Sequence, residues 1–78
     1  MIVFGGFVDG DRVNTVFRFN FKTSEWRSVG LGEVNPSPRA SHSATIADNY
    51  MYVFGGKDND DEKLNDLWRL DLDTDVWE

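Results

Sequence analysis

The chain has 78 residues, of which 40% are hydrophobic, 28% charged and 14% aromatic, and its net charge is -6. Negative charge opposes binding to nucleic acids and anionic membranes, and no apolar run reaches the roughly 18 residues of a membrane helix, so neither partner is expected. Zero cysteines exclude disulfides and thiolate metal sites, and they favour an intracellular location, cytoplasmic or nuclear.

The chain begins with a motif that occurs twice. Residues 1–6 read Met-Ile-Val-Phe-Gly-Gly, and residues 51–56 read Met-Tyr-Val-Phe-Gly-Gly, fifty positions later. Each run is short, β-branched and aromatic, which predicts a buried strand that ends at its glycine pair. A repeat of this period is typical of stacked or radial architectures, in which each unit buries its apolar faces against its neighbours.

Polar segments follow both motifs. Residues 6–13 contain Asp9-Gly10, and residues 56–63 contain a strongly acidic run, so both are predicted to be loops. A twelve-residue calcium loop counted from Asp58 would need Gly at its sixth position and Glu at its twelfth, where this chain has Lys63 and Arg69. The acidic run is therefore predicted to be a solvated loop without a metal.

Residues 15–21 and 66–72 alternate polar and apolar side chains. Alternation with period two predicts a strand with one buried face in each segment. The apolar side chains are Phe17, Phe19 and Phe21 in the first segment and Trp68, Leu70 and Leu72 in the second. Tight polar turns are predicted next, and Trp26 and Trp77 open a further strand.

The stretch between the two copies occurs once. Its glycines and prolines predict a loop over residues 30–38, which leads into the small, β-prone residues 41–47. Ser37-Pro38 matches the pattern of proline-directed phosphorylation, although its expected role is to shape this loop. One full repeat thus holds four antiparallel strands, the content of a propeller blade.

These motifs together resemble the kelch repeat family of β-propellers. The matching segments are Pro38-Arg39-Ala40-Ser41-His42-Ser43-Ala44, Tyr52-Val53-Phe54-Gly55-Gly56, Leu64-Asn65-Asp66-Leu67-Trp68 and the repeated Trp. The resemblance implies an all-β fold of four-stranded antiparallel kelch sheets in an incomplete ring. It divides the chain into a blade lacking its first strand (1–30), an interblade loop (31–41) and a blade truncated in its fourth strand (42–78). A ring needs roughly 4 to 8 blades, so we expect a piece of a longer protein.

The resemblance also implies a function. In kelch propellers, the loops between the second and third strands and between blades gather on one face, which commonly binds another protein. We therefore expect a noncatalytic protein-protein interaction module with a scaffold or adaptor role, because exposed loops on a rigid ring usually carry recognition residues. The predicted partner-binding residues are Phe7, Asp9, Asp11, Arg12, Glu33, Asn35, Arg39, Lys57, Asp58, Asp60, Asp61, Glu62 and Lys63.

Other conspicuous residues are predicted to be structural. They are Gly5, Gly6, Trp26, His42, Gly55, Gly56, Trp68 and Trp77. His42 and Ser43 do not form a nucleophile pair, because neighbours on a strand point to opposite faces. No catalytic, cofactor-binding or metal-binding set is predicted, and the chain by itself is not expected to be an enzyme.

Two alternatives remain open. The chain could belong to a propeller enzyme resembling the copper-dependent galactose oxidases, which need Tyr and His ligands and a Cys-modified Tyr. This chain has one His and no Cys, so such residues would lie outside it. The remaining kelch blades of the same protein are the expected neighbours, and a homo-oligomer is the alternative way to complete the ring.

Overall fold

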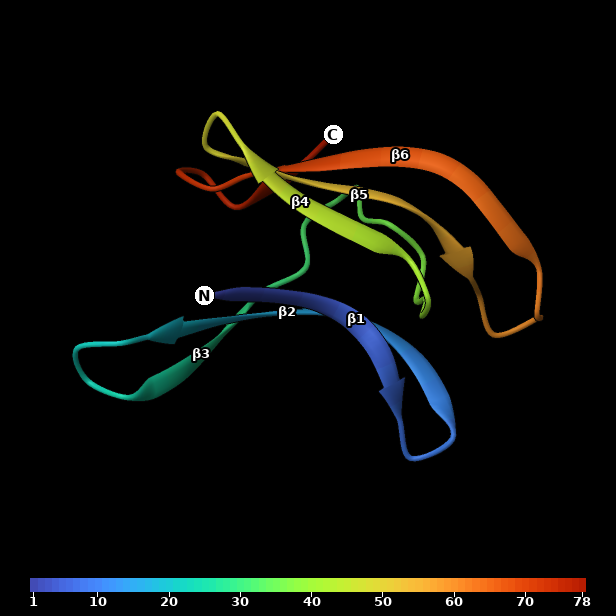
Figure 1. Cartoon of the computed structure of the whole chain (residues 1–78), viewed down its shortest axis with the longest axis horizontal. Helices are drawn as coiled ribbons and strands as arrows, with labels where there is room; N and C mark the ends of the chain where they lie inside the picture. The colour runs from blue at the N-terminus through green and yellow to red at the C-terminus, as the bar shows by residue number, and fades with distance from the viewer.

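A computed structural model describes residues 1–78 as two antiparallel sheets (Figure 1). The first sheet has the order β1-β2-β3, with β1 at Ile2–Val8, β2 at Asp11–Asn20 and β3 at Glu25–Val29. The second sheet has the order β4-β5-β6-β7, with strands at Ser43–Ala47, Tyr50–Lys57, Lys63–Asp71 and Val76–Trp77. The all-β prediction is confirmed, and the two sheets do not close into a ring. No helix is long and apolar enough to cross a membrane.

Both glycine pairs lie within strands, so the prediction that they end strands is wrong. The pairing register shifts between Phe4 and Gly6 and again between Phe54 and Gly56, which marks a bulge at each pair. All four glycines have positive φ, at 69°, 111°, 70° and 98° in chain order. This backbone suits glycine and bends the strand without ending it. The strands continue to Val8 and Lys57, so the predicted loops shorten to hairpin tips.

The predicted polar turns are confirmed, and the two copies form them alike. Asn20 Oδ1 accepts hydrogen bonds from the amides of residues 22 and 23 at 2.9 and 3.3 Å. Asp71 Oδ1 accepts the equivalent bonds from residues 73 and 74 at the same two distances. A side-chain oxygen that accepts from the next residues stabilises a tight turn. The sequence repeat is therefore also a repeat of local structure.

The hydrophobic core lies between the two sheets. It comprises six buried residues, two from the first sheet and four from the second: Phe4, Val16, Met51, Val53, Leu70 and Trp77. The rings of Phe4 and Trp77 meet edge to face with centroids 5.0 Å apart. Each sheet thus covers one face of the other and leaves its second face open.

The predicted buried face of residues 66–72 is confirmed, whereas that of residues 15–21 is not. Leu70 is fully buried, but Phe17 and Phe21 are 39% and 73% exposed, and the buried side chain of β2 is Val16. The reason is the position of the neighbour. The first sheet covers the Leu70 face of the second sheet, and nothing in this chain covers the corresponding face of the first.

The linker between the sheets is hydrogen-bonded to both of them. The Arg39 amide donates to Val13 O at 3.1 Å, and the Ala40 amide donates to Lys57 O at 3.0 Å. A Cβ atom on Gly56 would lie 2.7 Å from Ala40 O. The second glycine pair therefore allows a close backbone approach in addition to its bulge.

Candidate functional site

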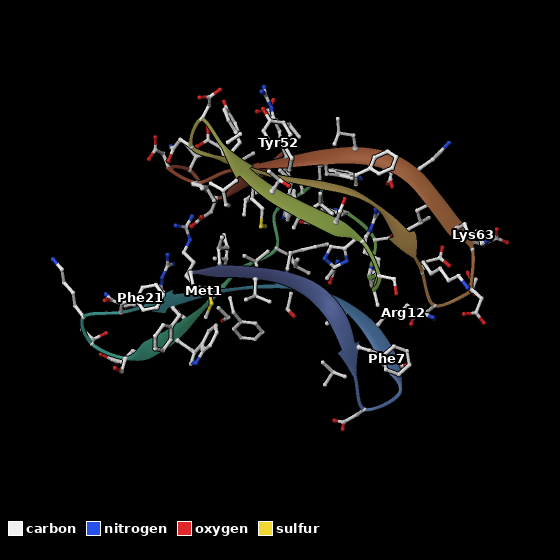
Figure 2. The ribbon with its side chains drawn as sticks, viewed as in Figure 1. Met1, Phe7, Arg12, Phe21, Tyr52 and Lys63 are labelled. Carbon is white, nitrogen blue, oxygen red and sulfur yellow. The ribbon has the colours of Figure 1, made fainter.

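Two hairpin tips meet at one end of the sheets. The Arg12 amide donates to Asn59 Oδ1 at 2.8 Å, and Asn59 Nδ2 donates back to Arg12 O at 3.1 Å. Arg12 Nη1 donates to Asp58 O at 3.0 Å and lies 3.2 Å from Asp61 Oδ1. Arg12 thus joins the β1–β2 hairpin to the β5–β6 hairpin, and Figure 2 shows it between Phe7 and Lys63.

The joined hairpins expose apolar and acidic groups together. Phe7 and Val8 are 60% and 54% exposed, and the Arg12 guanidinium carbon lies 5.3 Å from the centre of the Phe7 ring. Five of the predicted carboxylates at this end are exposed: Asp9, Asp11, Asp60, Asp61 and Glu62. The carboxylate of Asp58 is half-buried. Asp58 shapes its own loop, because its Oδ1 accepts the amides of residues 60 and 62 at 3.0 Å each.

The linker is tied to the first sheet by one side-chain hydrogen bond. Asn35 closes a small loop with Gly32: its Nδ2 donates to Gly32 O at 2.7 Å, and its Oδ1 accepts the Gly32 amide at 3.0 Å. Glu33 lies exposed within that loop. Asn14 Nδ2 donates to Pro36 O at 3.1 Å and ties the linker to β2. We call the two joined tips, residues 7–13 and 57–63, together with the predicted linker segment 30–38, the loop surface.

Arg39 does not lie on the loop surface. Its side chain is 1% exposed, and all five guanidinium N–H groups have acceptors. Nε donates to Ser37 O, and Nη2 donates to Ser37 Oγ. Nη1 donates to Gly55 O, and both Nη atoms donate to the Asp66 carboxylate. These hydrogen bonds lower the pKa of Asp66 to about 2. Burial therefore removes Arg39 from the predicted partner-binding residues and makes it structural.

His42 lies between the sheets. Its ring meets the Phe4 ring edge to face at a centroid distance of 5.2 Å, and burial lowers its pKa below the ordinary value. Its Nδ1 is buried without a hydrogen-bond partner. No three His, Asp or Glu side chains are grouped so that they could hold a metal ion. The surroundings of His42 are those of a packing residue.

Two groups of residues were missed by the sequence prediction. Leu31 and Val34 are exposed apolar residues on the linker, where no periodic pattern marks them. In the second group, Arg18 Nη2 donates to Leu72 O at 2.8 Å and forms an ion pair with Asp75. The sequence could have indicated Arg18, because the equivalent position of the second copy is also an arginine, Arg69.

The open face of the first sheet is apolar. It corresponds, residue by residue, to the face of the second sheet that is buried. Met51, Val53 and Trp77 are 2%, 0% and 6% exposed, while their repeat counterparts Met1, Val3 and Trp26 are 57%, 40% and 55% exposed. A groove lined by Phe19, Trp26, Ile46 and Leu72 opens beside this face, away from the loop surface. The open face is therefore a packing face that lacks its neighbour.

Two repeated antiparallel sheets that pack face to face, with the β1–β2 and β5–β6 hairpin tips joined at one end, fit blades of a β-propeller. The comparison with protein families agrees. The KLHDC2/KLHL20/DRC7 Kelch-repeats domain matches residues 1–78. The chain belongs to the kelch repeat family, as the sequence motifs predicted.

Known proteins with this repeat are several times longer than the chain. It is 38% identical over 84 residues to the leucine-zipper-like transcriptional regulator 1 homolog of Drosophila melanogaster, covering 99% of this chain and 8% of that protein. It is 45% identical over 65 residues to kelch domain-containing protein 1 of Mus musculus, covering 82% and 16%. It is 35% identical over 74 residues to tRNA wybutosine-synthesizing protein 2/3/4 of Arabidopsis thaliana, covering 95% and 7%. The chain thus spans less than a fifth of each relative.

Proposed function

We propose that this chain is part of a protein-interaction module with a scaffold or adaptor role, and that its loop surface contacts the partner. The observation that carries the proposal is the reciprocal Arg12–Asn59 bonding, which holds two hairpin tips together beneath an exposed Phe7. A surface that is ordered before binding loses less conformational entropy when a partner docks. An exposed aromatic ring on such a surface is a typical contact residue.

The charge of the loop surface indicates the chemistry of the partner. Its three segments carry seven carboxylates and three basic side chains. Complementary potentials favour a partner segment that is basic and presents an apolar group for Phe7. Binding is then expected to weaken as salt concentration rises, because exposed charges are screened.

Partner capture by the full-length protein tests the proposal. Phe7→Ala combined with Asp60→Lys removes the exposed ring and reverses one charge, while Thr23→Ala changes an exposed turn at the opposite end of the sheets. The double variant is expected to lose at least one partner that both the wild type and Thr23→Ala retain. If every partner stays bound to the double variant, the loop surface is not the interaction site.

The open faces support a second part of the proposal, which concerns the neighbours of the two blades. We propose that further blades of the same protein cover them, as the first sheet covers Met51, Val53 and Trp77. A second copy of this chain is the competing occupant, and light scattering of the 78-residue chain distinguishes the two. A concentration-independent monomer supports neighbouring blades, whereas oligomers of defined size support self-assembly.

A catalytic role for the whole protein is the alternative function. One relative is named for tRNA wybutosine synthesis, and the sequence motifs also leave open a propeller enzyme that resembles the copper-dependent galactose oxidases. For a copper enzyme of that kind, the catalytic residues would lie outside this chain. Copper analysis of the full-length protein tests the galactose-oxidase alternative. Stoichiometric bound copper would favour this enzyme over the interaction module.

A further inference from the structure

One exposed serine of the linker is followed by proline. Ser37 is exposed between the buried Pro36 and the half-buried Pro38. A residue that precedes proline is held in extended backbone. Hydrogen bonds anchor both sides of the serine, since Asn14 holds Pro36 O and the Arg39 amide donates to Val13 O. An extended serine followed by proline has the form that proline-directed protein kinases accept.

The Ser37 hydroxyl already faces a buried cation. Arg39 Nη2 donates to Ser37 Oγ at 3.1 Å, and the same nitrogen donates to Asp66 Oδ2 at 3.0 Å. Each of these bonds uses its own N–H group. A phosphate oxygen attached to Oγ can therefore accept the N–H that now points at the hydroxyl, while Asp66 keeps its own bonds.

We propose that Ser37 is a phosphorylation site for a proline-directed kinase and that Arg39 holds the phosphate. Ser37 Oγ attacks the γ-phosphorus of ATP, the bond from that phosphorus to the β,γ-bridging oxygen breaks, ADP leaves, and the hydroxyl proton passes to a base of the kinase. The ester adds a charge of about -1.5 to -2 at neutral pH. Its bond to the guanidinium joins a cation to an anion, whereas the bond it replaces joins the same cation to a neutral hydroxyl, so the new bond is stronger.

The modification would act on the loop surface, although the proposal does not depend on the function of that surface. Ser37 lies in residues 30–38, and the three segments already carry more carboxylates than basic groups. Phosphorylation would make the surface more acidic and strengthen its attraction for a basic segment. Residues 30–38 would then be a regulated part of the module.

Kinase treatment of the full-length protein tests the site. The protein is incubated with ATP and a proline-directed kinase, and the modified residue is located by peptide mass spectrometry. One phosphate is expected on Ser37, none at this position in Ser37→Ala, and at least about a tenfold lower rate in Pro38→Ala, a loss of the size that one specific contact supplies. A peptide of residues 32–42 serves as the unfolded comparison. An unmodified Ser37 in the folded chain overturns the proposal, whatever happens to the peptide.

The contact with Arg39 has a separate measurement. Phosphorus NMR of the phosphorylated chain gives the second pKa of the phosphate, which is about 6 in an unperturbed phosphoserine. A neighbouring guanidinium favours the dianion, so this pKa is expected to lie at least about 0.5 below that of the phosphorylated peptide. Equal values in chain and peptide would show that the phosphate points into solvent, which overturns the role of Arg39.

Discussion

Arg39 and Asp66 form a bidentate ion pair, with Nη1 2.7 Å from Oδ1 and Nη2 3.0 Å from Oδ2. The indole of Trp68 donates to the same carboxylate at 2.8 Å. Because a buried cation without a counter-charge is strongly destabilising, this pair keeps the linker between the two sheets. It couples a residue of the interblade segment to the middle of β6.

Removing the charge of Asp66 is expected to destabilise the fold. Asp66→Asn places an amide donor against a guanidinium that only donates, and the free energy of unfolding should fall by about 2 kcal/mol. Urea titration measures the loss. Asp60→Asn is the control, because Asp60 is exposed and its only hydrogen bond is made by its backbone amide. It should change stability by less than about 0.5 kcal/mol, and equal losses in both variants would contradict the role of the pair.

Acid stability follows from the same carboxylate. The pKa of Asp66 is about 2 in the folded chain against an ordinary value of 3.8. A depressed folded pKa contributes stability that is complete above the ordinary value and is lost as the pH falls from 3.8 towards 2. Unfolding monitored by circular dichroism between these pH values should be steeper in the wild type than in Asp66→Asn. Identical acid limbs would argue against the assigned pKa.

His42 is expected to titrate below its ordinary pKa. Burial favours the neutral ring, so the unfolded chain binds the proton more readily. Its contribution to stability is therefore present above pH 6.5 and declines as the pH falls below this value. The chain has one histidine, so proton NMR follows its ring without ambiguity. A measured pKa at or above 6.5 would contradict the effect of burial on this ring.

The two repeated tryptophans provide a matched test of the open face. Trp77 is 6% exposed and Trp26 is 55% exposed, although they hold the same place in the repeat. Trp77→Phe is expected to lower the free energy of unfolding by about 1 to 2 kcal/mol through lost packing. Trp26→Phe should cost less than about 0.5 kcal/mol. Equal costs by urea titration would mean that the Trp26 face is covered in solution.

Alanine substitutions at Gly6 and Gly56, the second glycine of each pair, distinguish the cost of backbone strain from the cost of steric contact. Gly6 and Gly56 both have positive φ, at 111° and 98°, but a Cβ on Gly6 would meet nothing within 4 Å. Both alanine variants should lose about 1 kcal/mol from backbone strain. Gly56→Ala should lose at least about 1 kcal/mol more, because its methyl group would clash with Ala40 O and force a backbone shift. Thermal unfolding compares them, and equal melting temperatures would refute the close approach.

The positions of the loop surface could be predicted from the sequence, but its rigidity could not. Composition placed polar tips after each Gly-Gly motif, because Asp, Asn and Gly favour turns over strands. The joining of these tips depends on contacts between Arg12 and Asn59, which are 47 positions apart. Turn composition and side-chain alternation do not predict a contact between residues so far apart in the chain. Arg39 was misplaced for the same reason, since a guanidinium is normally exposed unless five acceptors converge on it.

The repeated Met-x-Val-Phe-Gly-Gly and the alternating strands by themselves determined the repeat unit, its four antiparallel strands and the order in which they follow one another. Backbone preferences and side-chain period are local, so the sequence displays them directly. Only the tertiary structure decided which face of the first sheet is buried. Val16 and Phe17 are adjacent in β2 and point to opposite faces. The second sheet packs on one of these faces, so Val16 is buried and Phe17 stays exposed. Burial is a property of the neighbour as much as of the strand.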